Sequence, residues 1–190
     1  MQLIKLKFCL ILFLQFAEGN PEAKIYWSSV TYTSNPTYVS DFSVIIFNDT
    51  DGDTKSNMTV TQLEDMEKFI ITIVLKQSSK KGMKDFDREL LRINADTCKL
   101  SQGSFKNYIV RNLFREFIEV SNLRFSCPQL KGTFYLRKFL LPGSIPYMDK
   151  FLRNTVNGYF EFTLLIRAKP FKKKLTDGVC VKAYGIYTFE

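Results

Sequence analysis

Hydrophobic residues recur at alternate positions through most of the chain, which is typical of β-strands with one buried face. The clearest alternation spans residues 158–167, where aromatic and aliphatic side chains occupy every second position. Residues 68–76 are apolar on both faces, so we expect that strand to be covered on both sides or to face a cavity. The pattern predicts eight strands in all, over residues 25–32, 38–47, 58–63, 68–76, 86–93, 133–141, 158–167 and 179–189.

One segment follows the helical period instead. Between Ser104 and Val120, apolar residues recur at spacings of three and four, and Ser104 can cap the amino end. We expect this helix, over residues 104–120, to pack its apolar stripe on a sheet in preference to lying on a membrane. The stripe consists of Phe105, Tyr108, Ile109, Leu113, Phe117 and Val120. Together the elements predict a mostly β fold, a two-sheet β-sandwich with one packed helix.

The first 19 residues have the order of a secretory signal peptide. Lys5 and Lys7 precede an apolar run over residues 8–16, and small residues follow it. The alternative, an uncleaved membrane anchor, is disfavoured because nine residues cannot cross a hydrocarbon core of about 30 Å. We therefore expect residues 1–19 to be removed and residues 20–190 to form a single domain that is secreted and extracellular.

The chain of 190 residues contains no histidine, although 45% of it is hydrophobic and 18 residues are Phe. The absence of histidine excludes Ser-His-Asp and Cys-His mechanisms and removes the commonest zinc ligand. A hydrolase would then need paired carboxylates, and Asp85, Asp87 and Glu89 lie in a charged segment with no sign of burial. The spaced acids of residues 48–53 suit a solvated turn better than a calcium loop. We expect no enzyme activity, no catalytic residue, no metal and no cofactor.

The formal net charge of +8 bears on partners rather than on fold. Lysines cluster over residues 169–174 and again at Lys76, Lys80, Lys81 and Lys84. Such basic loops can bind anionic membrane lipid or glycans, although solvated loop tips are the simpler interpretation. Nucleic acid is not expected as a partner of an extracellular protein.

Removal of the leader leaves three cysteines, Cys98, Cys127 and Cys180. In an oxidising compartment, an odd number permits at most one intrachain disulfide and leaves one thiol over. Two glycosylation sequons begin at Asn48 and Asn57, and we expect both asparagines to lie in exposed turns.

Residues 127–136, which read CPQLKGTFYL, resemble the "CP, then KGT, aromatic, Leu" block of the lysosomal ganglioside activator family. Within that family, the sequence Ser121-Asn122-Leu123, the length of 190 residues and the basic charge look most like the insect chemosensory B (CheB) proteins. The resemblance is best over residues 98–189. Further matches follow in order along the chain: Pro142 and Pro146, Asn157-Gly158-Tyr159, and Gly178-Val179-Cys180-Val181-Lys182-Ala183.

This resemblance implies a β-cup, in which two sheets surround an apolar cavity with rim loops at one end. It implies lipid binding without chemistry: a secreted carrier or presenter of a lipid, pheromone or cuticular hydrocarbon in chemosensory perception, with a chemoreceptor or membrane surface as partner. The family bridges the positions of Cys98 and Cys127, so we expect that disulfide, which would stabilise the fold by about 3–4 kcal/mol. The family partner of Cys180 is missing near Val30, so we expect Cys180 to be a free thiol or an intermolecular link.

The residues that we expect to line the cavity, each with plain core packing as the alternative, are Phe69, Ile71, Ile73, Phe134, Leu136, Phe160, Phe162 and Leu164. A rim loop of Ile145, Pro146, Tyr147 and Met148 would contact lipid. The alternative function is an extracellular binding module whose basic loops contact anionic membrane lipid, a glycan or a receptor, without a cavity ligand. Salt distinguishes the two, because an electrostatic partner dissociates as ionic strength rises and an apolar ligand does not.

Overall fold

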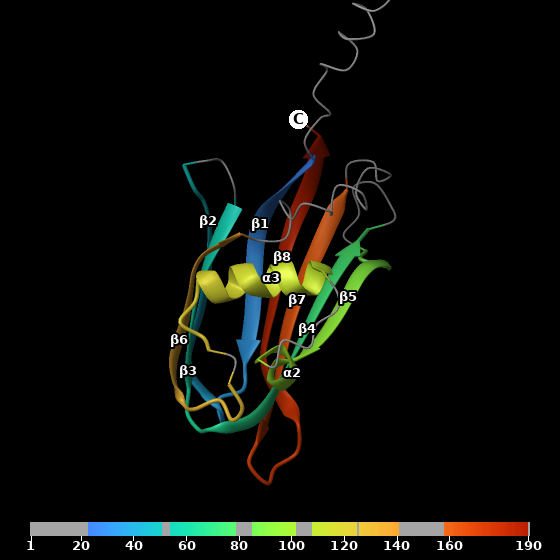
Figure 1. Ribbon diagram of the computed structural model, residues 1–190. Coiled ribbons are helices and arrows are strands. Elements are labelled where there is room, and N and C mark those ends of the chain that lie inside the picture. The colour runs from blue at the N-terminus through green and yellow to red at the C-terminus, as the bar shows by residue number, and fades with distance from the viewer. Residues whose placement is uncertain are drawn as a thin grey trace, which may run out of the picture.

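The computed structural model describes residues 23–50, 54–78, 85–101, 108–124, 126–140 and 158–189, which contain eight strands and two helices (Figure 1). Each predicted strand overlaps an observed one, and most observed strands are longer than predicted. The helices are α2 Thr97–Ser101 and α3 Tyr108–Glu119. The strands are β1 Ala23–Ser34, β2 Val39–Asn48, β3 Thr54–Gln62, β4 Met66–Gln77, β5 Arg88–Asp96, β6 Gly132–Leu140, β7 Tyr159–Pro170 and β8 Thr176–Phe189.

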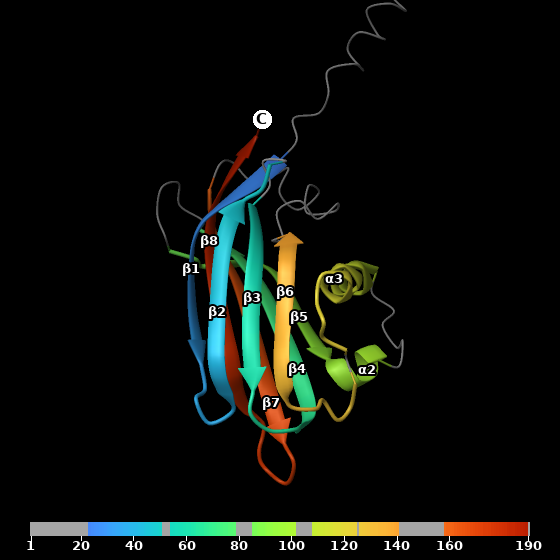
Figure 2. The ribbon, with the colours of Figure 1, turned by 90° about the vertical axis from the view of Figure 1, so that its left-hand side faces the viewer.

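The strands form two sheets that pack face to face (Figure 2). The larger sheet has the order β1-β8-β7-β4-β5, and the smaller sheet has the order β2-β3-β6. All neighbouring strands in both sheets are antiparallel. The buried core draws residues from the inner faces of both sheets and from α3. The predicted mostly β, two-sheet sandwich is therefore confirmed.

Strand β7 shows how alternation builds the buried face of the larger sheet. Phe160, Phe162 and Leu164 are buried and belong to the core between the sheets. Glu161 lies between them on the opposite face and is buried as well, with its carboxylate 3.6 Å from Nζ of Lys182 on β8. The partner charge offsets the cost of burying this carboxylate.

Strand β4 is buried on both faces, as its sequence predicted. Ile71, Ile73 and Leu75 join the core, and the intervening Thr72 and Val74 are buried on the other face. The strand lies between β7 and β5 in the larger sheet, so its backbone is paired on both sides. A strand in this position needs the continuous apolar run that the sequence shows.

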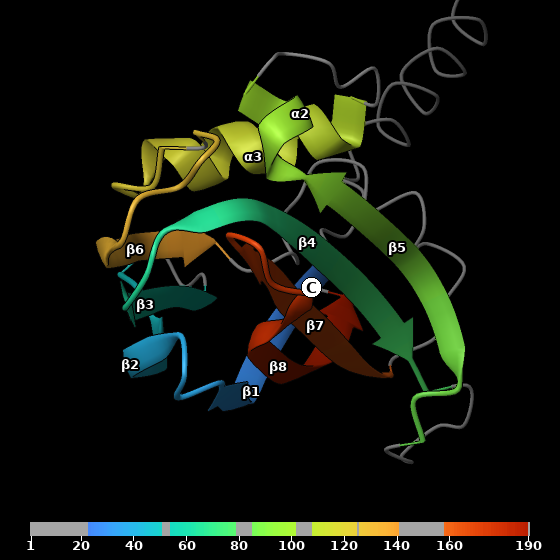
Figure 3. The same cartoon turned by 90° about the horizontal axis from the view of Figure 1, so that it is seen from below.

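Both helices lie on one side of the sandwich, where they cover the gap between β6 and β5 (Figure 3). Helix α3 buries Phe114 and Phe117, and the ring of Phe117 meets that of Phe139 on β6 with 5.7 Å between centroids. The apolar stripe packs on a sheet as predicted, but it includes Phe114, which the predicted stripe omitted. Residues 104–107 of the predicted helix lie outside the described residues.

Helix α2 is a second helix that the hydrophobic pattern did not indicate. Its five residues are too few to show a period. Asp96 caps it, because Oδ1 accepts a hydrogen bond from the N–H of Cys98 at 3.1 Å. Thr97 Oγ1 also donates to the carbonyl oxygen of Phe69 on β4 at 3.3 Å. In the described part of the chain, neither helix is long and apolar enough to cross a membrane.

The two sequon asparagines lie in different settings. Asn48 ends β2 and is exposed beside a turn, as expected. Asn57 lies inside β3 on the outer face of the smaller sheet, and its Oδ1 accepts a hydrogen bond from the N–H of Lys138 at 2.9 Å. The expectation of a turn at Asn57 was wrong, because its backbone pairs with Ile45 of β2 and its side chain binds the backbone of β6 at Lys138. The β3–β6 register is irregular at this residue.

Candidate ligand cavity between the sheets

A cavity of about 80 Å³ lies between the two sheets. It is placed toward the β7–β8 hairpin, because its lining includes Ala168 near the end of β7 and Gly178 near the start of β8. Helix α3 contributes Phe117 to its wall. The other apolar lining residues are Val39, Phe42, Met58, Val60, Met66, Phe69, Ile71, Leu123, Phe134, Leu136, Ile166 and Val179.

Four of the eight residues expected at a cavity line this one: Phe69, Ile71, Phe134 and Leu136. A smaller cavity of about 30 Å³ lies further along the same inner faces, and Leu136, Phe162 and Leu164 border it. The remaining two, Ile73 and Phe160, are buried in the core and line neither cavity. Core packing, the alternative given for every position, therefore describes these two.

Strand β2 also lines the cavities, although none of its residues was expected there. Val39 and Phe42 line the larger cavity, and Val44 and Ile46 line the smaller one. The alternation of Phe42, Val44 and Ile46 on one face of the strand was a signal that could have identified them. Phe117 was likewise visible as part of the helical stripe. Hydrophobic periodicity does not show that the smaller sheet and α3 face the same cavity.

Three polar side chains at the larger cavity are hydrogen bonded to the protein. Nε2 of Gln62 donates to the carbonyl oxygens of Glu64 at 2.8 Å and Gln129 at 3.3 Å. Oγ1 of Thr97 donates to a carbonyl of β4, as described above, and Oγ of Ser121 accepts from the N–H of Leu123 at 3.3 Å. Since these groups already form hydrogen bonds and the remaining lining is mostly apolar, the cavity provides few hydrogen-bond partners for water.

At the other end of the inner face, two buried polar atoms lack a hydrogen-bond partner within the described part of the chain: Nε1 of Trp27 and Oε1 of Gln77. In the register of the larger sheet, Trp27 pairs with Gly185, Gly185 with Phe160, and Phe160 with Gln77. Directly paired residues point to the same face of a sheet, so Trp27 and Gln77 share the inner face with Phe160. The ring of Trp27 meets that of Phe162 on β7, with 6.0 Å between centroids.

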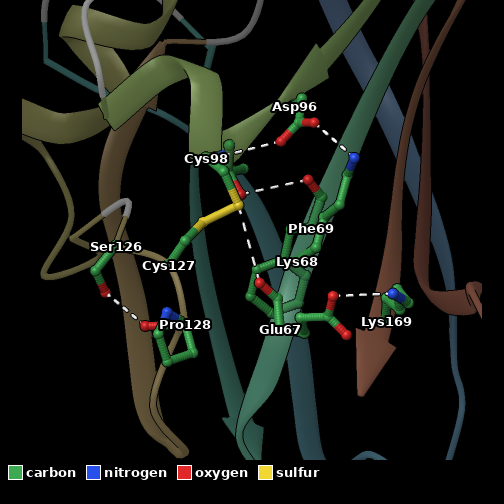
Figure 4. The surroundings of a disulfide bond; sticks show 10 residues. Glu67, Lys68, Phe69, Asp96, Cys98, Ser126, Cys127, Pro128 and Lys169 are labelled. Carbon is green, nitrogen blue, oxygen red and sulfur yellow. Dashed lines mark hydrogen bonds and ion pairs between the residues drawn. A yellow bond between two sulfur atoms is a disulfide. The ribbon is translucent and has the colours of Figure 1, made fainter. Parts of the chain in front are cut away.

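A disulfide between Cys98 and Cys127 joins α2 to the segment that precedes β6 (Figure 4). The expected bridge is thus confirmed. Helix α2 follows β5 of the larger sheet, whereas β6 belongs to the smaller sheet. The disulfide therefore links the two sheets on the side that the helices cover, next to Thr97 in the cavity wall.

The carboxylate of Asp96 fixes the α2 side of this bridge. It accepts hydrogen bonds from Nζ of Lys68 at 2.7 Å and from the N–H of Cys98 (Figure 4). Burial raises the pKa of Asp96, but the bonds from Lys68 and Cys98 outweigh it, so this pKa lies below its ordinary value. Asp96 is therefore charged at neutral pH and holds Lys68 of β4 against the start of α2.

Cys180 lies on β8 and forms no disulfide within the described residues. It pairs in register with Thr33 of β1 and Leu165 of β7, and it is half-buried. Burial raises the pKa of the Cys180 thiol. The thiol is therefore protonated at neutral pH, which makes it a weak nucleophile.

The expected rim loop, residues 145–148, lies outside the described residues, as do Lys80, Lys81 and Lys84. Lys76 is half-buried near the end of β4. The first lysine cluster, residues 169–174, surrounds the β7–β8 turn.

The model of a family described as "Protein of unknown function (DUF1091)" matches residues 71–163. The matched segment begins in β4 and ends in the first half of β7, so it includes both helices, both cysteines of the disulfide and β6. Strands β1, β2, β3 and β8 lie outside it. No curated protein matches the sequence.

Proposed function

We propose that this protein is a secreted carrier that binds a hydrophobic ligand between its two sheets. The observation that carries the proposal is the cavity of about 80 Å³, which is lined by apolar side chains of both sheets. Its polar lining groups Gln62 and Thr97 are already hydrogen bonded to the protein. Such a cavity favours an apolar guest, because each buried CH₂ group contributes about 0.8 kcal/mol.

The cavity is smaller than the ligand that it is proposed to hold. An apolar cavity of about 150 Å³ accommodates benzene, and pockets for larger ligands have volumes of about 300–1,000 Å³. A long-chain ligand therefore requires the sheets to separate. The described strands of the two sheets form no common ladder, so their separation breaks mainly side-chain packing. The bridge between Met66 and Gln129 and the disulfide would hold the sheets together at the side that the helices cover.

The two ends of the inner face suit a long ligand with one polar group. The cavity reaches Val179 of β8. Trp27 and Gln77 lie on the line of paired residues that includes Gly185, which is six residues beyond Val179 on the same strand. At about 3.3 Å per residue, the separation is about 20 Å. An acyl chain in one leaflet spans about 15 Å, half of a bilayer core, so a long alkyl chain fits this length. A fatty alcohol, fatty acid or long-chain ester would place its chain in the cavity and its oxygen near Trp27 or Gln77.

Secretion and a chemosensory role belong to the same proposal. The disulfide fits an oxidising compartment, and residues 1–19 have the features of a signal peptide. The ordered matches from Cys127 to Ala183 support a relationship to the ganglioside activator family. The likeness to insect chemosensory B proteins supports pheromone perception as the process that such a carrier serves.

Ligand binding can be tested with hexadecanol, hexadecanoic acid and hexadecane, each measured by displacement of a fluorescent fatty-acid probe. In the variant Val60→Phe, an aromatic ring occupies the cavity that Val60 lines. We expect this variant to lower affinity about tenfold or more, which corresponds to about 1.4 kcal/mol.

The matched control is Leu91→Phe, which enlarges a half-buried side chain of β5 that lines neither described cavity. This control should bind like the wild type. Absence of uptake by the wild type, or equal binding by the two variants, would contradict the cavity as the binding site.

A further inference from the structure

The β7–β8 hairpin projects from one end of the sandwich, beyond the neighbouring loops (Figure 1, Figure 2). Three loops meet at this end, over residues 63–65, 129–131 and 171–175, and we call them together the hairpin end. The N–H of Lys131 donates to Oδ1 of Asp65 at 2.8 Å, which joins the second loop to the first. Nζ of Lys173 donates to a carboxylate oxygen of Glu64 at 3.0 Å, which joins the hairpin to the first loop. The hairpin end is therefore one connected surface.

The hairpin end exposes large apolar side chains on all three loops. An isolated exposed apolar residue needs no explanation, whereas several that gather on one surface indicate an interaction site. The exposed fractions are 46% for Leu63, 62% for Leu130, 51% for Phe171 and 37% for Leu175.

Lysines stand between these apolar side chains. Lys131, Lys172 and Lys174 are exposed, and within the described part of the chain none of the three forms an ion pair. Glu64 is paired with Lys173. Asp65 accepts a hydrogen bond from the backbone N–H of Lys131 and keeps its negative charge. These loops nevertheless carry a net positive charge, because the lysines at positions 131, 172, 173 and 174 outnumber the two acids.

The turn has a lysine at a position where its backbone conformation favours glycine or asparagine. Lys172 has a φ of 60°, in the left-handed region that glycine or asparagine adopts at lower cost. A side chain kept at a conformational cost, at the tip of a projecting hairpin, is consistent with a role in contact rather than in folding.

We propose that the hairpin end docks on an anionic lipid bilayer. Phe171 and Leu130 enter the headgroup region, and Lys172 and Lys174 contact lipid phosphates and carboxylates. Apolar side chains on projecting loops, flanked by long cationic chains, suit insertion into a soft interface more than contact with a flat protein surface. The contact between Lys173 and Glu64 keeps the hairpin in position for this.

The docking surface lies next to the cavity. Leu63 of the hairpin end directly follows Gln62, which lines the cavity. Lys173 of the hairpin contacts another lining residue, Tyr38, because its Nζ lies 5.5 Å from the centre of that ring. A bilayer at the hairpin end would therefore face the half of the sandwich where the cavity lies. The inference does not depend on the cavity being filled, so a protein without a cavity ligand can still dock.

Sedimentation with vesicles tests the docking surface on the full secreted protein. The vesicles are phosphatidylcholine alone, or phosphatidylcholine with about one third phosphatidylserine. We expect binding to the anionic vesicles that weakens as salt rises and little binding to the neutral ones. Lys172→Gly should lower that affinity by roughly fivefold, as expected for one lysine near an anionic surface, without lowering the melting temperature. Asp177→Asn, which removes an exposed acid beside the hairpin, should raise it.

The apolar part of the surface has its own matched control. The double variant Phe171→Ala, Leu130→Ala removes two exposed side chains of the hairpin end, whereas Ile45→Ala removes one that is 62% exposed on β2. We expect the double variant to lose most of its vesicle binding and Ile45→Ala to lose none, with both retaining the circular dichroism of the wild type. Equal binding by all three proteins, equal binding to neutral and anionic vesicles, or no vesicle binding at all would overturn the proposal.

Discussion

The two ends of the inner face of the larger sheet differ in packing and in polarity. Near the hairpin, Phe69, Ile71 and Val179 border a cavity with a mostly apolar lining, in which Gln62, Thr97 and Ser121 are hydrogen bonded to the protein. At the other end, Phe160 is fully buried in the core, and Trp27 and Gln77 each hold one buried polar atom that has no hydrogen-bond partner among the described residues. One end is therefore loosely filled and mostly apolar, whereas the other is tightly filled and holds polar atoms that lack such a partner. This difference suits the ligand that we propose, an alkyl chain with one polar group.

The largest effect should come from truncating the packed end. Phe160→Ala should lower the free energy of unfolding by about 3–5 kcal/mol, because it leaves a cavity in a filled core. Phe69→Ala should cost clearly less, since Phe69 is only partly buried and already borders empty space. Urea denaturation of the two variants measures this contrast. Equal losses would show that the two ends are packed alike.

Removal of the disulfide should loosen the cavity end. Cys98→Ser combined with Cys127→Ser should reduce stability by about 3–4 kcal/mol, because the bridge closes a loop with a sequence separation of 29. Hydrogen exchange should quicken first in α2 and the segment before β6, and later in the row of Phe160. Uniform acceleration across both ends would show that the bridge does not act on the cavity side in particular.

The unsatisfied end can be examined with a pair of buried glutamines. Gln77→Leu removes a buried oxygen that has no partner in the described part of the chain, so it should raise stability by about 1–2 kcal/mol. It should also lower the affinity for hexadecanol relative to hexadecane. Gln62→Leu is the control, because it deprives two carbonyl oxygens of their donor and should destabilise the fold by about 1–3 kcal/mol. If Gln77→Leu also destabilises the fold, Gln77 is hydrogen bonded within the protein, and its proposed contact with the ligand would be contradicted.

The smallest effect is the pH dependence of the stability that Asp96, next to the disulfide, contributes. The pKa of Asp96 is lower in the folded protein than its ordinary value, so its contribution is complete above about pH 4 and is lost as pH falls further. Asp96→Asn should reduce stability at pH 7 by about 0.5–1 kcal/mol and leave it unchanged near pH 2. Melting temperatures of both proteins across this range provide the measurement. A constant difference at all pH values would assign the effect to the amide itself.

Local patterns predicted the strands well because alternation reports one buried face, as in β7, and because the continuous apolar run of β4 reports two. They were less informative where tertiary contacts decide. Asn57 is held in β3 by its pairing with β2 and by the hydrogen bond of its side chain to β6, and α2 is held by its cap and the disulfide. Of the eight residues expected at a cavity, four line the larger one and Phe162 and Leu164 line the smaller one, whereas Ile73 and Phe160 fill the core. Periodicity shows which face is buried, but it does not show where the opposing sheet leaves a space.

The central claim is that the protein carries a hydrophobic ligand between its sheets. Native mass spectrometry of the protein secreted from insect cells, with solvent extraction and identification of any bound molecule, tests it most directly. We predict one long-chain molecule with a single oxygen-containing group per protein, in the wild type and in Leu91→Phe but not in Val60→Phe. A wild-type protein that is recovered empty and fails to take up fatty alcohols, fatty acids or hydrocarbons would contradict the account, and the cavity would then be a packing defect.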